Sequence, residues 1–341
     1  MKSLFAVPLI GLSLPEKLDK PIVMPNIGEM WTDDQVLLTN NPADLDEIMS
    51  HLDPEDERCE RRNELMRLIE SYCAIYVQDS ALFESASDSL GQKQLMALML
   101  AHPFFKLTEL LLWSIKDNWV YAGAARLFMP NDIYLEWGAH HRSTDSTGLW
   151  TEPNEFNVSD LNSFVKLLNG ELWKDCRHVA SITAGADVRC MTRTLSLRGV
   201  PRTVRCLGFL DQARSMIEVG LKLTLYVTCL ETLFSTDALE LSNKLAQRVA
   251  FFVGGNSIER QDIFKIMKNI YAGRSKVIHG DAVNEAIKIL EASQNADQLL
   301  RRVLNKIYSH AENKSLFESN NEDFNNYFDD LILSGDIAAF E

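Results

Sequence analysis

The sequence predicts a mainly α-helical protein in which an N-terminal α+β domain is followed by an antiparallel four-helix bundle. Residues 1–50 mix short apolar runs with Pro, Gly and Asn-Asn turns, which is typical of strands joined by loops. From about residue 158 onward, the apolar residues recur at helical spacing. The loops between the later helical runs ("STDA", "GGNS" and "GD") are short, and short loops join antiparallel neighbours in a bundle.

Residues 1–150 form the predicted α+β domain, to which we assign a sensing or regulatory role. Its first element should be a strand, because Phe5, Val7 and Leu9 alternate with other residues. No small-residue cleavage site follows this apolar run, so it does not read as a secretory signal. A helix capped by Asp53 is expected over 53–77, and two more helices over 91–104 and 107–119. A strand-turn-strand unit over 125–138 and a polar loop over 139–156 follow.

Residues 158–312 form the predicted helical domain, and 313–341 form an acidic tail. The expected helices begin with one capped by Ser159 and include one unusually long periodic run, at 158–175, 203–235, 239–253, 258–279 and 282–310. The tail is rich in Asn but keeps aromatic residues such as Phe317, Phe324 and Phe328. A disordered tail would lack these residues, so we expect it to dock as a short amphipathic segment.

The distribution of charge leaves room for a polyanionic partner although the net charge is −14. Residues 1–90 hold 7 basic and 18 acidic residues, and 311–341 hold 1 and 8, so the middle of the chain has 26 basic against 22 acidic. No apolar run approaches the ~20 residues that cross a bilayer. Six scattered cysteines without a C-x2-C pair indicate buried, reduced thiols. We therefore expect a cytoplasmic protein without a membrane partner.

The stretch "YAGRSKVIHGD" carries the strongest chemical signal. Arg274 and His279 lie five positions apart near a helix end, with Gly280 as a natural residue to follow the helix and Asp281 as the next N-cap. Five positions correspond to about 140° of rotation, so the two side chains would not share one helix face. They would converge if the helix ended between them, or if a second subunit supplied an opposite copy.

These residue types suit the cleavage of RNA without a metal. Attack by a 2′-OH on the adjacent phosphate needs a group that moves protons near neutral pH, which histidine supplies. It also needs a fixed cation on the phosphate oxygens, which a guanidinium supplies with two parallel donors. Alternatively, Arg274 and Lys276 simply complement the dipole at a helix C-terminus.

This region resembles the HEPN superfamily, and more narrowly the Apea-like HEPN proteins. The resemblance rests on the order and spacing of "CLETLF", "LSNKLAQRVAFFVG" and "IFKIMKNIYAGRSKVIHG", and it covers about residues 205–310. It implies a dimerising four-helix bundle whose motif, Arg then a polar residue then His, lines a composite cleft between two bundles. It makes Arg274 and His279 the catalytic candidates. The accessory positions it implicates are Ser275, Glu231 and Arg248. Of the accessory residues, Glu231 and Arg248 would form an ion pair that positions the motif helix.

Five arginines in "VRCMTRTLSLRGVPRTVR" form a candidate RNA track, because arginine suits phosphate contacts. They are Arg189, Arg193, Arg198, Arg202 and Arg205, and Lys276 is a further candidate for RNA contact. A solvated face with local ion pairs is an equally good reading of the track. His140 and His141 lack a convergent third ligand, so we predict no metal site and no cofactor.

Together these observations predict a metal-independent endoribonuclease that acts on RNA, with tRNA as one candidate substrate, and that works as a homodimer or higher homo-oligomer. The resemblance implies a role in anti-phage defence or a toxin-like role, with a regulatory partner reached through the N-terminal domain. The acidic tail suggests a form of self-restraint, in which it covers the basic cleft. The alternative is a non-catalytic interaction or nucleotide-binding module that works as a subunit of a larger assembly.

Overall fold

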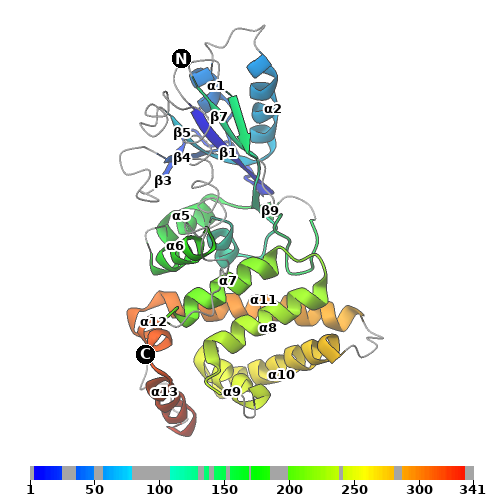
Figure 1. The fold of residues 1–341 in the computed structure, drawn as a ribbon, viewed down its shortest axis with the longest axis vertical. Helices are drawn as coiled ribbons and strands as arrows, with labels where there is room; N and C mark the ends of the chain where they lie inside the picture. The colour runs from blue at the N-terminus through cyan, green and yellow to red at the C-terminus, as the bar shows by residue number, and fades with distance from the viewer. Residues whose placement is uncertain are drawn as a thin grey trace, which may run out of the picture. The chain divides into compact units, whose positions relative to one another are not determined.

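The computed structural model describes residues 4–24, 36–49, 57–78, 108–129, 134–137, 142–150, 154–168, 170–184, 199–237, 241–279 and 286–334. The chain is mostly helical and has a small antiparallel sheet near its N-terminus (Figure 1). It separates into two compact units, the first made of residues 1–143 and 150–180 and the second of residues 144–149 and 181–341. We call these unit 1 and unit 2.

The expected domain boundary near residues 150–158 differs from this division. The two helices that follow residue 158 are α5 (Val158–Leu167) and α6 (Glu171–Ala184), and α5 with most of α6 groups with unit 1. The expected single helix is broken near Gly170, whose backbone N–H bonds to Leu167 O at 3.0 Å. Its cap is Asn157 rather than Ser159, because Asn157 and Asp160 form a reciprocal capping box.

Unit 1 is built on a seven-stranded antiparallel sheet in the order β3-β4-β5-β1-β7-β8, with β6 also paired to β1. The strands are β1 (Leu4–Ile10), β3 (Ile22–Met24), β4 (Val36–Thr39), β5 (Cys73–Gln78), β6 (Tyr121–Ala122), β7 (Ala125–Phe128) and β8 (Tyr134–Trp137). A separate parallel pair joins β2 (Leu12–Ser13) to β9 (Asn154–Glu155). Residues 108–115 are helical.

The predicted first strand is confirmed, and it lies at the centre of the sheet. β1 pairs with β5 from Leu4 opposite Gln78 to Leu9 opposite Cys73. Leu4 and Ala6 pack in a core with helices α1 (Ala43–Met49) and α2 (Glu57–Ser71), which cover one face of the sheet (Figure 1). Because Phe5 and Val7 on the other face are buried as well, this strand belongs to the interior on both sides.

The expected helix over 53–77 was wrong in its last six residues. The helix α2 ends at Ser71, and "CAIYVQ" forms strand β5 between β1 and β4. The run Ile75, Tyr76 and Val77 is β-branched and aromatic, which favours a strand, and the three residues are buried. Asp53 and the expected helix 91–104 lie outside the described residues. The strand-turn-strand unit is confirmed by the antiparallel pairing of β7 with β8.

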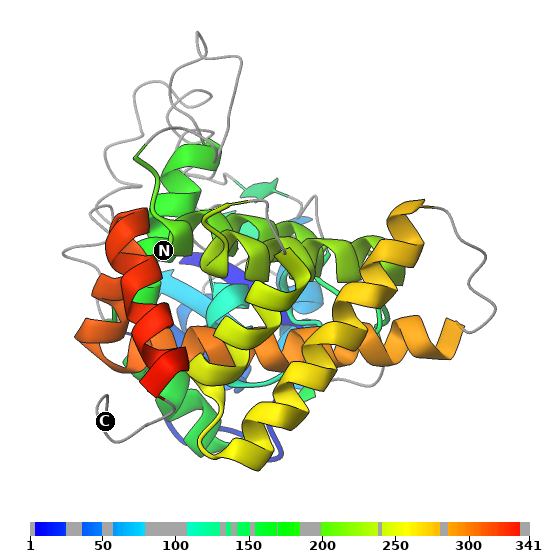
Figure 2. The same ribbon diagram turned by 90° about the horizontal axis from the view of Figure 1, so that it is seen from below.

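Unit 2 consists mainly of helices. They are α7 (Arg202–Arg214), α8 (Val219–Phe234), α9 (Leu241–Val253), α10 (Ser257–His279), α11 (Ala286–Ser309), α12 (Ala311–Glu318) and α13 (Asn321–Ser334). The helices α8, α9, α10 and α11 all contact one another, and α7 packs mainly against α8. Figure 2 shows α9 and α10 side by side, with α12 and α13 away from the C-terminal end of α10.

The expected long helix over 203–235 is in fact the two helices α7 and α8. The break falls at residues 215–218, where Glu218 caps α8 by accepting hydrogen bonds from Gly220 N at 2.9 Å and Leu221 N at 2.5 Å. Residues 144–149 pack at this break, and Gly148 has a φ of 77° there. A Cβ on Gly148 would lie 2.2 Å from Ile217 O, so this turn requires glycine.

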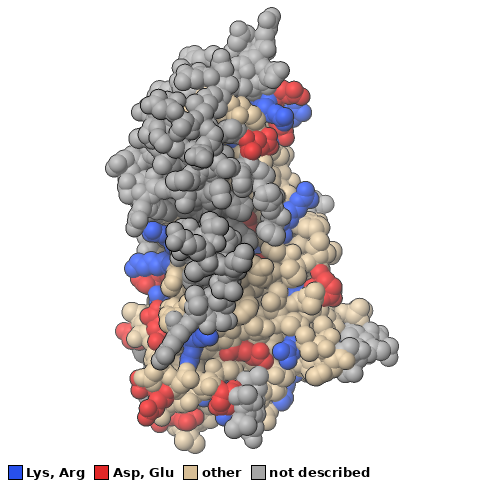
Figure 3. All heavy atoms as spheres, in the orientation of Figure 1, with Lys and Arg blue, Asp and Glu red and all other residues tan. Residues whose placement is uncertain are grey.

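The acidic tail docks through its aromatic residues, as the sequence predicts, and it completes the core of unit 2. Phe317, Phe324 and Phe328 are fully buried, and Phe317 and Phe328 stack against Phe234 of α8 at 5.3 and 5.8 Å between ring centroids. The acidic side chains of α13 remain on the surface, at the lower left of Figure 3. Of the described helices, none is long and apolar enough to cross a membrane.

We predict that Phe324→Ala destabilises unit 2 by about 3–5 kcal/mol, because it removes a fully buried ring. Urea unfolding followed by circular dichroism measures the change, and hydrogen exchange reports whether α13 opens first. Leu333→Ala on the same helix is the matched control, because Leu333 is 85% exposed and its loss should cost under about 0.5 kcal/mol. Equal stability of the two variants would contradict the docking of α13.

Candidate functional site

The helix α10 carries both predicted catalytic residues and is held by an apolar stripe. Ile263, Met267 and Ile270 recur at helical spacing and are buried. Gly273 continues this stripe where neighbouring helices approach closely. A Cβ there would lie 3.2 Å from Leu223 of α8 and 3.4 Å from Ala292 of α11. This close approach at Gly273 fixes how α10 lies against α8 and α11 at the residue just before Arg274.

Arg274 belongs to a half-buried group with Glu231 of α8 and Tyr271 of α10. The hydroxyl of Tyr271 and the charge of Arg274 both act on the carboxylate of Glu231. The guanidinium carbon of Arg274 lies 5.8 Å from the centre of the Tyr271 ring. Glu231 therefore faces Tyr271 and Arg274 of α10 and not Arg248, its predicted partner.

Burial is the dominant influence on this group's ionisation. It raises the pKa of Glu231 above its ordinary value, while Arg274 and the hydrogen bond from Tyr271 act to lower it. Burial also raises the pKa of Tyr271, and the nearby charge of Glu231 adds to that increase. Among the described residues, neither Oε1 of Glu231 nor Nε of Arg274 has a hydrogen-bond partner. Both side chains therefore keep hydrogen-bonding capacity.

His279 is the last residue of α10 and is exposed, as the sequence predicts. The helix continues without a break from Arg274 to His279, so the two side chains remain about 140° apart around its axis. Between them in the sequence, Ser275 is half-buried and Lys276 is exposed. Gly280 and Asp281 lie outside the described residues. One chain thus presents a held arginine and an exposed histidine that do not converge on the same helix.

The predicted role of Arg248 was wrong. Its guanidinium donates to Phe234 O at 2.7 Å and to Asn325 Oδ1 at 2.7 Å, so it joins the end of α8 to α13. It also lies 5.6 and 5.5 Å from the rings of Phe324 and Phe328. Arg248 therefore secures the tail and does not pair with Glu231, which faces α10.

The predicted arginine track is not an open surface where the structure describes it. Arg202 is only 7% exposed, because it lies 4.2 Å from the ring of Phe324 and donates a hydrogen bond to Asn321. Burial lowers the pKa of Arg202, and the charges of Arg205 and Arg248 act in the same direction. Arg205 is half-buried, and Arg189, Arg193 and Arg198 lie outside the described residues.

The same contacts bear on the predicted self-restraint. The tail covers Arg202 and Arg248, but α13 lies on the opposite side of unit 2 from the end of α10 that carries His279 (Figures 1 and 2). The described part of the tail, up to residue 334, therefore does not cover the Arg274 and His279 end. Its removal would take buried phenylalanines out of the core, which is a different consequence from opening a cleft.

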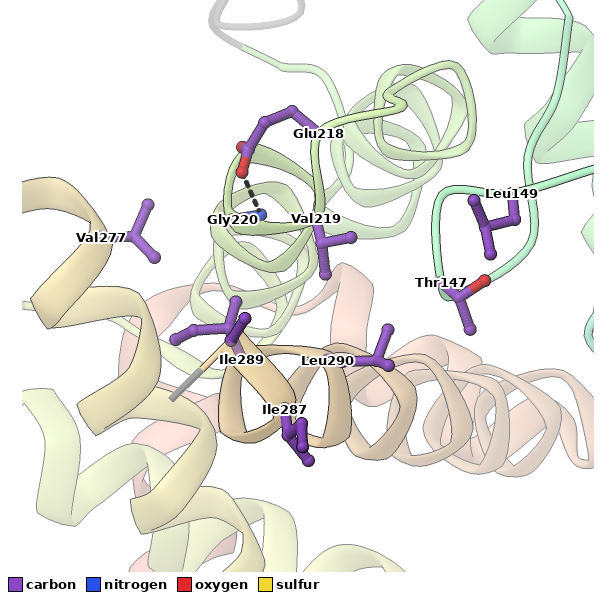
Figure 4. Close-up of a pocket in the computed structure, with 10 residues that line it drawn as sticks. Thr147, Leu149, Glu218, Val219, Gly220, Val277, Ile287, Ile289 and Leu290 are labelled. Carbon is purple, nitrogen blue, oxygen red and sulfur yellow. Dashed lines mark hydrogen bonds between the residues drawn. The ribbon is translucent and has the colours of Figure 1, made fainter. Parts of the chain in front are cut away.

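An apolar cavity of about 540 Å³ lies beside the motif end of α10. Figure 4 shows Val277 of α10, Val219 of α8 and Ile289 of α11 around it, with Thr147 and Leu149 on the far side. The carboxylate of Glu218 is directed to its own helix at Gly220 N. The cavity suits packing against another apolar surface better than it suits chemistry.

Other candidate chemistry is sparse in the part of the chain that the structure describes. Among these residues no group of three or more His, Cys, Asp or Glu side chains could hold a metal ion. His140 and His141 lie outside them. Burial raises the pKa of Cys73 to about 12 and that of Cys229 well above its ordinary value, which makes both poor nucleophiles.

Sequence reasoning placed Tyr271 in the apolar core and so missed its part in the site. The signal was available, because Tyr271 precedes Arg274 by three positions, and side chains at that spacing are neighbours on a helix. A search of known proteins adds no further assignment: no protein-family model, no curated protein and no solved structure matches the chain.

We predict that Glu231→Gln stabilises the protein relative to the wild type increasingly as pH rises. A carboxyl whose pKa is raised by folding binds more protons in the native state, so its contribution to stability is lost as pH rises from about 4.3 through the folded pKa. The glutamine does not titrate, so the difference in unfolding free energy between variant and wild type should grow across this window. Urea unfolding at several pH values measures it.

Glu322→Gln serves as the control for the loss of one carboxylate, because Glu322 is exposed on α13. A difference between Glu231→Gln and wild type that stays constant with pH, or shrinks as pH rises, would contradict the assigned environment of Glu231.

Proposed function

We propose that the protein is a metal-independent endoribonuclease of HEPN type, in which α8–α11 form the four-helix bundle and two copies build the site. The observation that supports this most directly is the contrast on α10 between a half-buried Arg274 beside Glu231 and an exposed His279. Phosphodiester cleavage needs both properties, because the cation must be preorganised and the proton-transfer group must reach the substrate. We further propose a cytoplasmic role in anti-phage defence or as a toxin-like enzyme.

The proposed reaction is an internal transfer at one phosphate of the RNA. The 2′-oxygen attacks the adjacent phosphorus as His279 accepts the 2′-OH proton, and the bond from phosphorus to the 5′-oxygen breaks. The leaving 5′-oxygen takes a proton from the second copy's His279. Arg274 stabilises the negative charge on the non-bridging oxygens through its guanidinium donors, and Ser275 offers a nearby hydroxyl. The products are a 2′,3′-cyclic phosphate and a 5′-OH.

Dimerisation is proposed because one chain holds only half of this arrangement and exposes apolar side chains next to it. Ile278 of α10 is 50% exposed and Ile287 of α11 is 70% exposed, and Leu149 is exposed at the rim of the apolar cavity. Apolar patches of this kind on a folded surface are typical of interfaces. A second copy that covered them would bring its own α10 end toward Arg274 and His279.

The first experiment tests the reaction. Purified protein in EDTA should cleave tRNA or total RNA and leave cyclic-phosphate ends. Arg274→Ala and His279→Ala should each reduce the rate by at least about 100-fold, because they remove a preorganised cation and a proton-transfer group. Arg67→Ala and His310→Ala are the matched controls, because both residues are exposed and neither belongs to the proposed site. Both variants should retain the wild-type rate. Absence of cleavage under all conditions would support the non-catalytic module instead.

The second experiment tests the interface. Ile287→Glu should shift the protein toward monomer in sedimentation velocity and should reduce cleavage in parallel, because it places a charge in the proposed apolar contact. Leu333→Glu is the matched control, since Leu333 is also exposed but lies on α13. A monomeric variant that cleaves RNA at the wild-type rate would contradict a site shared between two copies.

A further inference from the structure

A second pocket, distinct from the apolar cavity, lies between α9 and α10 and has a volume of about 490 Å³. We call it the aromatic pocket, because Phe251 of α9 and Phe264 of α10 line it and both are half-buried. The volume falls within the range of pockets that bind small ligands. Two half-buried rings in one pocket present flat apolar faces that the fold does not fully cover.

The cations at this pocket are placed to act together with the rings. The guanidinium carbon of Arg260 lies 4.7 Å from the centre of the Phe251 ring, so the guanidinium is already part of an aromatic stack. Lys265 is exposed at the rim, where Asp262 lies 3.6 Å from its Nζ. Glu259, the other acid on this turn, bonds to Arg302 at 2.6 Å and to Gly255 N at 2.9 Å.

The amide side chains of Gln247 and Gln261 complete the lining. An amide offers both a donor and an acceptor, which is what the polar edge of a nucleobase requires. Proteins recognise unpaired bases by stacking them on aromatic rings or guanidinium planes and by bonding their edges, with cations on the backbone. The combination of rings, a stacked arginine, amides and a rim lysine therefore fits a nucleotide with an exposed base.

The aromatic pocket shares one side of α10 with His279, whereas Arg274 lies about 80° around the helix axis from Phe264. Phe264, Lys268, Tyr271, Ser275 and His279 fall within about 80° around the helix axis at 100° per residue. Lys268 marks the side that faces α9, because its Nζ donates to Ser242 Oγ at 3.0 Å and Asn243 Oδ1 at 2.8 Å. Phe264 lies about 15 Å along the axis from Arg274, at 1.5 Å per residue. An RNA strand that joins the pocket to Arg274 therefore has to cross from this side of α10 to the neighbouring one.

We propose that the aromatic pocket stacks an unpaired nucleobase of an RNA strand whose reacting phosphate lies several nucleotides away at Arg274. The inference rests on the proposed ribonuclease function and adds to it a preference for single-stranded substrate. The ring of Phe264 and the stacked pair of Phe251 and Arg260 hold the base, while Lys265 meets the backbone.

The experiment measures RNA affinity separately from cleavage. His279→Ala serves as the parent, so that the RNA stays intact, and fluorescence polarisation follows a labelled single-stranded oligoribonucleotide in EDTA. Adding Phe251→Leu or Phe264→Leu keeps apolar volume but removes the stacking face, and each should weaken binding about tenfold. Phe264→Tyr keeps an aromatic face and should bind as the parent does. Ile258→Ala, an exposed α10 residue outside the lining, should also leave affinity unchanged.

Two further measurements make the outcomes distinct. Lys265→Gln should lower the slope of log Kd against log salt by about 1, as expected for one lost phosphate contact. Free mononucleotides should compete poorly with the oligonucleotide; competition at equal concentration would assign the pocket to free nucleotides and overturn the inference. Parent protein that does not bind the oligonucleotide overturns it as well.

The inference and the proposed function fail separately. If wild-type protein cleaves RNA but the leucine variants bind as tightly as their parent, the aromatic pocket plays no part and the ribonuclease stands. If the leucine variants lose affinity but wild-type protein never cleaves RNA, the binding pocket stands and the catalytic proposal fails. Thermal melting of every variant shows whether a loss of affinity reflects unfolding.

Discussion

The helix α8 organises unit 2, because its buried polar side chains meet partners on different neighbouring helices. Lys222 donates to Ala213 O of α7 at 2.8 Å, and Tyr226 donates to Asp297 of α11 at 3.0 Å. The half-buried Glu231 faces Tyr271 and Arg274 of α10. Lys222 and Asp297 are almost wholly buried, and an unpaired charge at such depth costs several kcal/mol. Another arrangement of these helices would leave one of these groups without its partner. The polar pairs therefore select one helix packing out of several that the apolar stripes alone would allow.

This constraint explains why the two halves of the proposed site differ in their surroundings. Arg274 follows the contact of Gly273 with α8 and α11, and its charge lies near Glu231, so it inherits the rigidity of the helix packing. His279 comes more than one helical turn later, on an exposed end of α10. A preorganised cation costs no rearrangement during reaction, whereas a proton-transfer group has to follow the proton from one oxygen to another. The division of labour between a fixed arginine and an exposed histidine fits that requirement.

The sequence predicted the elements whose pattern is local, and it failed where a tertiary contact decided the outcome. Helices α9 and α10 and the end of α10 at His279 follow from periodicity and a glycine after the helix. The break between α7 and α8 is packed by Thr144, whose hydroxyl donates to Arg214 O and Met216 O, and β5 depends on neighbouring strands that no helical pattern reveals. Arg202 looked like a surface cation, yet Phe324, far along the chain, buries it. None of these three long-range contacts has a local signature in the sequence.

The acidic C-terminal segment shows how net charge and local function separate. α13 turns Phe324 and Phe328 into the core, and its exposed surface carries Glu322, Asp323, Asp329 and Asp330. Arg202 and Arg248 lie beneath the same helix, so part of the basic middle of the chain serves to hold its acidic end. A polyanion approaching α13 meets exposed acids, whereas at the end of α10 it meets the exposed Lys276 beside Arg274. Charge asymmetry of this kind orients an encounter, so it favours the approach of the proposed RNA substrate at the end of α10. A net charge of −14 is therefore compatible with that substrate.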